Sequence, residues 1–163
     1  VANKYLGLCY SHNKKYNKAN LYLKKAQSLD NKDRDIEKEL IYCMQDTQKI
    51  EKAEAYAKKY KKDADSMEFL ARVYYSYGDK EKGLTLLEES LKKYPKEPSL
   101  YNLKGLICFV TYDLKGAEDN FTKAIELKSV SIYYKNRGIF RKMLKNQKGM
   151  DEDFAIYSKL IED

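Results

Sequence analysis

The residues most able to do chemistry in this chain are one histidine, His12, and three cysteines, Cys9, Cys43 and Cys108. The spacing Cys9-x2-His12 is half of a zinc-binding pattern, but a structural zinc site needs four ligands at local spacing. A nucleophile needs a base and a group that orients it, and His12 is the only imidazole in the sequence. No glycine-rich phosphate loop is present. We therefore expect a protein that is not an enzyme, with no metal and no cofactor.

The composition narrows the fold class before any pattern is considered. The chain has 163 residues, 32 Lys+Arg against 25 Asp+Glu, and a net charge of +7. A hydrophobic fraction of 43% is too high for a disordered polyelectrolyte, and seven glycines with two prolines are too few for the turns of an all-β sandwich. The longest apolar run covers only residues 106–110, whereas a membrane span needs ~20 residues. These figures predict a soluble, helix-rich domain.

The cellular compartment is indicated by two features. The chain begins at Val1 with no basic-then-apolar leader, and its cysteines are odd in number and far apart, which makes a poor disulfide framework. We expect reduced thiols in the core, with Cys9 and Cys43 at matching small-residue positions. These features do not identify the compartment, but they favour a cytoplasmic location.

Small residues recur along the chain with a regular spacing. Anchors of one kind fall at 19, 53, 83, 117 and 150, with separations of 34, 30, 34 and 33; the first four are Ala or Gly, and Met150 departs from the pattern. A second set of small residues, Gly7, Ala71, Gly105 and Gly138, precedes four of these anchors. Two apolar-periodic segments in each unit of about 34 residues predict helix–turn–helix repeats. A small residue lets two helices approach closely while Leu, Tyr and Phe fill the space beside it.

In these positions the sequence resembles the tetratricopeptide repeat family, whose signature is W-x2-L-G-x2-Y, then A-x3-F-x2-A, then Pro. The resemblance implies an all-α fold, an α-solenoid of about five repeats forming a right-handed superhelix. It covers one domain, residues 1–163, with units at about 1–33, 34–63, 64–97, 98–130 and 131–163. The chain departs from the signature in having no Trp and a degenerate second unit. We also expect it to be a segment of a longer protein, because no clear capping helix closes the last repeat.

The resemblance further implies that the first helix of each repeat lines a concave groove. The function expected from it is that of a non-catalytic scaffold for protein–protein interaction, which binds a protein or peptide segment in that groove. In the second and third units the groove candidates are Tyr42, Arg72 and Tyr75. In the last two units they form an apolar floor edged by lysines: Leu106, Phe109, Val110, Ile139 and Met143, with Lys135 and Lys142. An exposed apolar surface of this kind usually marks a contact site, and we expect the partner to be acidic with apolar anchors.

One subclass of the family clamps the C-terminal carboxylate of its partner with Lys, Asn and Arg from three successive first helices. Lys4 fits that pattern, but Leu8 stands where Asn is expected. The sequence therefore disfavours this mode of binding.

Two alternatives follow from the fifth unit and from the end of the chain. Six cations precede the first acid of that unit, and they could neutralise phosphates while Tyr133 and Tyr134 stack on bases; they are Lys135, Arg137, Arg141, Lys142, Lys145 and Lys148. No base-reading motif accompanies them, so nucleic acid is the less favoured partner. The repeats could instead be a spacer or an oligomerisation segment, with a second copy covering the apolar floor at the C-terminal end.

Overall fold

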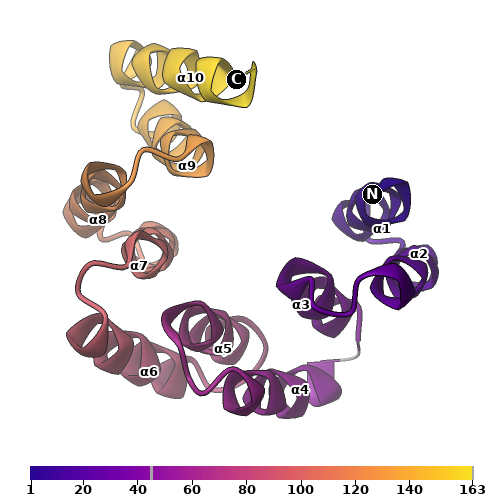
Figure 1. The fold of residues 1–163 in the computed structure, drawn as a ribbon. Helices are drawn as coiled ribbons and strands as arrows, with labels where there is room; N and C mark the ends of the chain where they lie inside the picture. Colours follow the sequence, from indigo (N-terminus) through magenta and orange to yellow (C-terminus); the bar gives the residue numbers. More distant parts are fainter. Residues whose placement is uncertain (45, 163) are drawn as a thin grey trace. The chain divides into compact units, whose positions relative to one another are not determined.

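The computed structural model describes residues 1–44 and 46–162, with side chains described throughout except at positions 46 and 47. In this part of the chain the protein forms ten helices and no strand (Figure 1). None of these helices has the length and apolarity that a membrane crossing requires.

The chain divides into two compact units, Val1–Leu84 and Thr85–Asp163, and each is described here by itself. The first contains α1 (Ala2–His12), α2 (Tyr16–Leu29), α3 (Arg34–Tyr42), α4 (Asp46–Lys59) and α5 (Ala64–Tyr77). The second contains α7 (Pro98–Val110), α8 (Leu114–Leu127), α9 (Ser131–Met143) and α10 (Gln147–Glu162). The division falls within α6 (Lys80–Lys93). That residues 1–163 form a single repeat domain stays a prediction.

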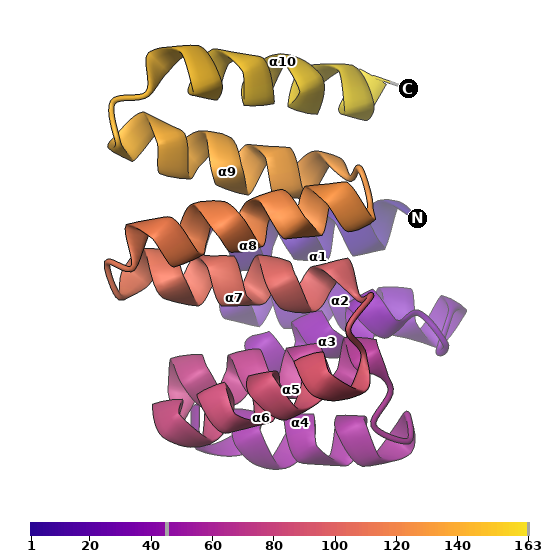
Figure 2. The ribbon, with the colours of Figure 1, turned by 90° about the vertical axis from the view of Figure 1, so that its left-hand side faces the viewer.

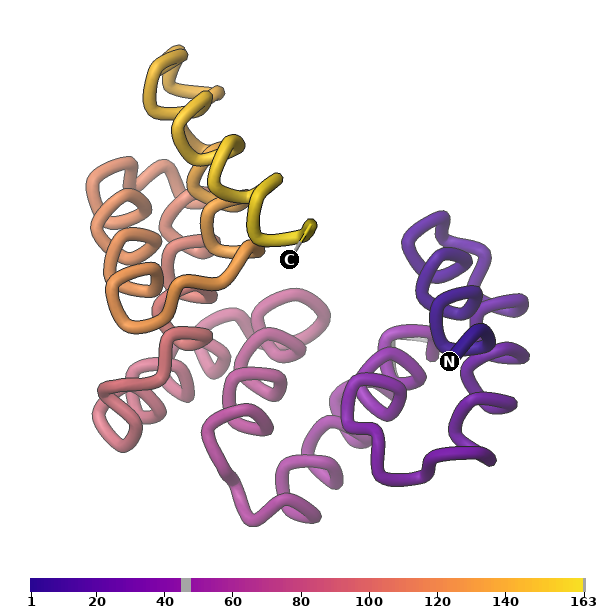
Figure 3. Tube along the Cα trace, turned by 45° about the horizontal axis from the view of Figure 1, so that its top comes forward, coloured from indigo at the N-terminus to yellow at the C-terminus, as the bar shows by residue number. Residues whose placement is uncertain are grey.

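Helices pack in successive antiparallel pairs, as the repeat pattern predicts. In the first unit α1 packs on α2, and the core between them and α3 is built from Ala19, Leu23 and Ala26 together with Ile36 and Leu40. Gly7 of α1 lies so close to α2 that a Cβ atom there would stand 2.6 Å from Leu23 Cγ. The Cα trace in Figure 3 shows the reversal of the chain between paired helices.

The second unit repeats this construction. Figure 2 shows α7, α8, α9 and α10 stacked in order, each running back along its predecessor. Ala117, Phe121 and Ala124 of α8 are fully buried, and Phe121 fills the space above Gly105 of α7. The small and aromatic residues of the repeat pattern therefore lie at the helix contacts, where the sequence predicts them.

Each first helix begins where a predicted unit begins: α3 at Arg34, α5 at Ala64, α7 at Pro98 and α9 at Ser131. The predicted fold class, an all-α array of helix–turn–helix repeats, is confirmed. The second pair, α3 and α4, packs less extensively than α1 and α2 or α7 and α8, in keeping with the degenerate second unit of the sequence.

Candidate functional site

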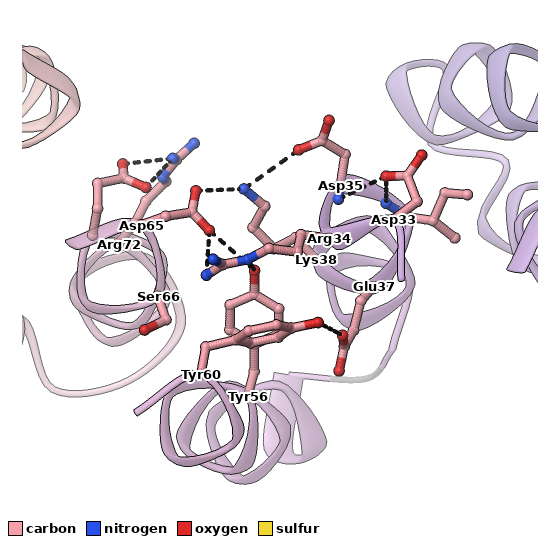
Figure 4. Close-up of polar contacts among 12 residues, drawn as sticks. Asp33, Arg34, Asp35, Glu37, Lys38, Tyr56, Tyr60, Asp65, Ser66 and Arg72 are labelled. Atoms are coloured by element: carbon pink, nitrogen blue, oxygen red, sulfur yellow. Dashed lines mark hydrogen bonds and ion pairs between the residues drawn. The ribbon is translucent and has the colours of Figure 1, made fainter. Parts of the chain in front are cut away.

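A ladder of ion pairs joins the amino ends of the first helices of unit 1. Figure 4 shows two of its members, Asp33 and Arg34, and beside them Lys38, which pairs with Asp35 and Asp65. Asp33 caps α3 by accepting from the backbone N–H groups of Asp35 and Ile36, and it also accepts from Lys4 Nζ of α1 at 2.7 Å. Asp63 caps α5 in the same way and accepts from Arg34 Nη1 of α3 at 2.7 Å. Each N-cap carboxylate therefore ties one first helix to the preceding one.

The same contacts shift the ionisation of the two carboxyl groups. The hydrogen bond from Arg34 holds the pKa of Asp63 well below its ordinary value, against the opposing effect of burial. At Asp33, burial raises the pKa, but the hydrogen bonds from Lys4 and from the backbone of Ile36 outweigh it and the net shift is downward. Both groups are held as carboxylates.

Lys4 of the ladder also lines a pocket of about 270 Å³ on the first helices of unit 1. We call it the first-helix pocket. Its lining comes from α1, α3 and α5 and consists of Lys4, Leu8, Asp35, Lys38, Glu39, Tyr42, Phe69 and Arg72. Two of the groove candidates predicted from sequence, Tyr42 and Arg72, thus meet in one cavity.

Two buried polar atoms of this pocket have no hydrogen-bond partner in the described part of the chain: the hydroxyl oxygen of Tyr42 and Nε of Arg72. The Tyr42 ring packs edge-on against Phe69, with ring centres 5.3 Å apart, and burial raises the pKa of its phenol to about 12. The phenol therefore stays protonated at neutral pH and can donate a hydrogen bond.

Arg72 is held through one nitrogen of its guanidinium group. Its Nη2 donates to both carboxylate oxygens of Glu68, at 2.5 and 2.6 Å, while Nε is buried although 43% of the side chain is exposed. Burial lowers the pKa of Arg72, but the charge of Glu68 overcomes this and raises it above its ordinary value. The fixed cation and the phenol of Tyr42 thus present two donors without acceptors.

Tyr75, the third candidate of unit 1, does not line the first-helix pocket. Its ring lies 5.8 Å from Lys80 Nζ, at the start of α6. The structure therefore brings together two of the three residues predicted here.

In unit 2 the predicted apolar floor separates into two layers. Leu106 and Phe109 are half-buried and pack on the core of Ala117, Phe121 and Phe140, with the Phe109 and Phe140 rings edge to face at 5.7 Å. Val110, Ile139 and Met143 are exposed by 60%, 40% and 64%. We call these three residues the apolar strip. They lie on α7 and α9, which are joined by a hydrogen bond from Asn136 to Asn102 at 2.8 Å.

The two lysines predicted at the edge of this surface are both exposed. Lys135 Nζ lies 5.8 Å from the centre of the Tyr157 ring on α10, so it stands on the side of α9 that meets α10. Lys142 is next to Met143 at the end of α9. Of the two lysines, Lys142 is therefore the one that is next to the apolar strip in the sequence.

The arginines of the basic fifth unit are used inside the fold. Arg137 donates to both carboxylate oxygens of Asp153, at 3.1 and 2.8 Å, and Arg141 donates to Asp153 and Glu118. Tyr133 is only 8% exposed. Two of the six cations and one of the two rings that a nucleic acid would need are therefore committed to the core.

The cysteines and the histidine do not form a site. Cys9 is exposed and is not part of the core of the first repeat, so its predicted place in the core is wrong; Cys43 is half-buried against that core. His12 Nδ1 is 2.8 Å from the carbonyl oxygen of Leu8, one turn earlier. Among the described residues, no group of three or more His, Cys, Asp or Glu could hold a metal ion.

Comparison with known proteins shows similarity in structure alone. No family model matches the chain, and no curated protein matches its sequence. Among solved structures, the thermophilic TPR protein TTC0263 of Thermus thermophilus superposes with a TM-score of 0.62 at 15% identity, over 99% of this chain and 89% of its own. Yeast Tom70 gives 0.62 at 15% identity, over 88% of this chain but 32% of its own. MamA of MSR-1 gives 0.56 at 15% identity, over 96% and 92%. The chain has the fold of these proteins.

Proposed function

We propose that this protein is a non-catalytic interaction module that holds a segment of another protein against its first helices. The observation that carries the proposal is the pair of donors without acceptors in the first-helix pocket, Tyr42 hydroxyl and Arg72 Nε. A buried polar group left unpaired costs about 1–3 kcal/mol, so native proteins keep few of them. A partner oxygen entering the pocket would accept from both groups and recover that cost.

The partner oxygen belongs to a backbone carbonyl or to an acidic side chain. Both donors remain protonated at neutral pH, since the pKa of Tyr42 is raised to about 12 and that of Arg72 lies above its ordinary value. The pocket also contains Lys4, which pairs with Asp33 at 2.7 Å, and Lys38, which pairs with Asp65 at 2.8 Å. An acidic segment fits a chain with a net charge of +7, in which residues 1–33 carry seven Lys against two Asp, or +5.

The apolar strip of unit 2 also binds a partner, in this case by burying the partner's apolar side chains. Val110, Ile139 and Met143 would each cover apolar side chains of a partner, and Lys142 would pair with an acid beside them. Burying apolar area contributes about 25 cal/mol per Å². Leu106 and Phe109 support these residues from below, because they pack on the core.

Peptides selected from a random-sequence display library on the whole chain test the proposal. We expect acidic peptides with apolar anchors, which separate into two groups by the variant that weakens them. Tyr42→Phe and Arg72→Leu should weaken the first group about tenfold, the size expected for one lost hydrogen bond to a charged or buried group. Val110→Asp with Met143→Asp should weaken the second by at least as much.

The matched control is Leu21→Asp with Ile161→Asp, which places two acids on exposed apolar positions of α2 and α10. It changes the net charge by the same amount as Val110→Asp with Met143→Asp and should leave both groups of peptides bound. Selected peptides that bind every variant with the same affinity would contradict the proposal. Self-association through the C-terminal end, and a role as a spacer, stay predictions.

A further inference from the structure

A second cavity of unit 1 lies away from the first-helix pocket, between α2, α3 and α4. Its volume is about 330 Å³, at the lower end of the ~300–1,000 Å³ usual for ligand sites. We call it the second-helix cleft. Its lining is an apolar floor with a polar rim: Leu40, Ile41, Met44, Ala55 and Tyr56 below, and Asn20, Lys24, Gln27, Glu37, Lys52 and Lys59 around the edge.

The cleft exists because α3 is short. It has nine residues, whereas α2 and α4 on either side have fourteen each. The carboxylate of Glu37 binds both Lys59 Nζ, at 2.7 Å, and the hydroxyl of Tyr60, at 2.8 Å, and so joins α3 to the last turns of α4. Among the described residues, the floor between α2 and α4 is left open.

One wall of the cleft carries a buried polar atom that nothing in the described part of the chain satisfies. Asn20 Oδ1 on α2 has no donor. A carboxamide offers an acceptor on one side and donors on the other. Whichever group faces the cleft, its natural complement is a second amide, with one N–H and one C=O.

The rim carries three lysines and one carboxylate, that of Glu37. Lys24 is exposed and makes no ion pair with the described residues, and the nearest carboxylate to Lys52 Nζ is that of its neighbour Glu51, at 3.9 Å. Lys59 is paired with Glu37 at 2.7 Å. Two lysines, one on each side of the apolar floor, are therefore available to an anionic ligand.

We propose that the second-helix cleft binds a short acidic peptide segment by an apolar side chain. The apolar side chain rests on Leu40, Ile41 and Met44, the peptide backbone bonds to the amide of Asn20, and flanking carboxylates pair with Lys24 and Lys52. A fatty acid would satisfy the floor and the lysines, but its ionised head has no N–H group. The cleft shares α3 with the first-helix pocket but none of its lining residues, so this site is independent of the function proposed above.

The experiment follows the methyl groups of Leu40, Ile41 and Met44 by NMR in the whole chain. The probe is acetyl-Glu-Leu-Leu-Glu-amide, with acetyl-Lys-Leu-Leu-Lys-amide and decanoate as comparisons. We expect saturable shifts of these methyl signals with the acidic peptide only. Lys24→Glu with Lys52→Glu should weaken binding by about fivefold or more, since two favourable ion pairs become repulsive. Its control is Lys115→Glu with Lys128→Glu, the same charge change on exposed positions of unit 2.

A variant that fills the cleft separates binding there from binding elsewhere. Ala55→Trp places an indole over the floor, and Ala155→Trp places one on the exposed face of α10. The first should abolish the shifts and the second should not, with helicity equal in both. Tyr42→Phe should leave these shifts unchanged, even if the first-helix pocket proves to bind nothing.

Four results would overturn the proposal. They are the absence of saturable shifts, shifts that persist in Ala55→Trp, equal or stronger binding of decanoate, and shifts that depend on protein concentration without any peptide. Equal or stronger binding of decanoate would assign the cleft to amphiphilic acids. Shifts that depend on protein concentration would assign it to a second copy of the chain.

Discussion

Tyr42 and Tyr56 lie in the same unit but differ in the partners of their hydroxyl groups. The hydroxyl of Tyr56 accepts from Arg34 Nε at 3.0 Å and donates to Asp65 at 3.1 Å. That of Tyr42 has no partner among the described residues. The loss of the same atom should therefore have opposite effects at the two positions.

Tyr42→Phe should leave the free energy of unfolding unchanged or raise it by up to about 1 kcal/mol, because it removes a buried group that is unpaired. Tyr56→Phe should lower it by about 1–3 kcal/mol, because Arg34 and Asp65 each lose a partner. Urea unfolding followed by circular dichroism measures both. Equal losses at the two positions would show that the hydroxyl of Tyr42 is satisfied in solution, and would remove the basis of the proposed pocket.

The buried charge of unit 2 is Asp153, whose side chain is only 1% exposed and which binds Arg137 and Arg141. Asp153→Ala leaves two largely buried guanidinium groups without their carboxylate. Breaking a buried pair in this way costs about 3–5 kcal/mol, and we expect that loss in urea unfolding. Asp119→Ala, at an exposed position of α8, is the control and should change stability by less than about 0.5 kcal/mol. A loss of similar size at both positions would mean that the network contributes little.

At the scale of helices, the closeness of a pair is set by the small residue at its crossing. A Cβ atom at Gly105 would stand 2.7 Å from Cδ1 of Phe121, which is fully buried and cannot move aside. At the equivalent Gly138 the nearest atom would be Asp153 Cβ at 3.3 Å. The pair α7–α8 therefore depends on its glycine more than the pair α9–α10.

Gly105→Ala should lower the free energy of unfolding by about 1–3 kcal/mol, the usual cost of overpacking. Gly138→Ala should leave it unchanged or raise it by up to about 1 kcal/mol, because alanine favours the helix more than glycine does. Thermal unfolding of the two variants compares them directly. The opposite order would contradict the packing described for these two pairs.

The ladder of N-cap carboxylates makes the stability of unit 1 sensitive to acid. The pKa of Asp63 is lowered in the folded state from an ordinary value of 3.8, mainly by the hydrogen bond from Arg34. Such a group stabilises the fold fully above its unfolded pKa, and the stabilisation is lost as pH falls toward the folded pKa. The loss should therefore occur as pH falls below about 4.

Asp63→Asn should make that loss smaller, because the amide keeps the N-cap but does not titrate. Stability is measured by urea unfolding at about pH 6, 4 and 3. Asp119→Asn, the control, should lose as much stability on acidification as the unmodified chain. If Asp63→Asn and the unmodified chain lose the same stability on acidification, the ladder is not the acid-sensitive element.

At the scale of the whole molecule, the repeat pattern predicts the helices well because it records helix contacts. Gly7, Ala19, Gly105 and Ala117 are small since another helix crosses there, and a contact of this kind must recur in every repeat. The starts of α3 and α5 carry a further signal, the N-cap residues Asp33 and Asp63. Aspartate at the predicted unit boundaries could have revealed the ladder.

The candidate sites are harder to predict from the sequence than the helices, because they depend on side chains from different repeats. No local pattern shows that Phe109 turns toward Phe140 while Val110 stays exposed, or that Tyr42 hydroxyl lacks a partner. The basic fifth unit suggests cations that could neutralise phosphates for the same reason. The sequence does not show that Arg137 and Arg141 bind Asp153. The composition gives the number of charged residues but does not show which of them form ion pairs.

The most direct test of partner binding by the first helices is hydrogen–deuterium exchange of the whole chain with and without a selected acidic peptide. Peptides weakened by Tyr42→Phe should slow exchange in α3 and α5, and peptides weakened by Val110→Asp with Met143→Asp should slow it in α7 and α9. Helices α8 and α10 should keep the rates of the free protein. Slower exchange confined to α8 and α10, or no change at saturation, would contradict binding through the first helices.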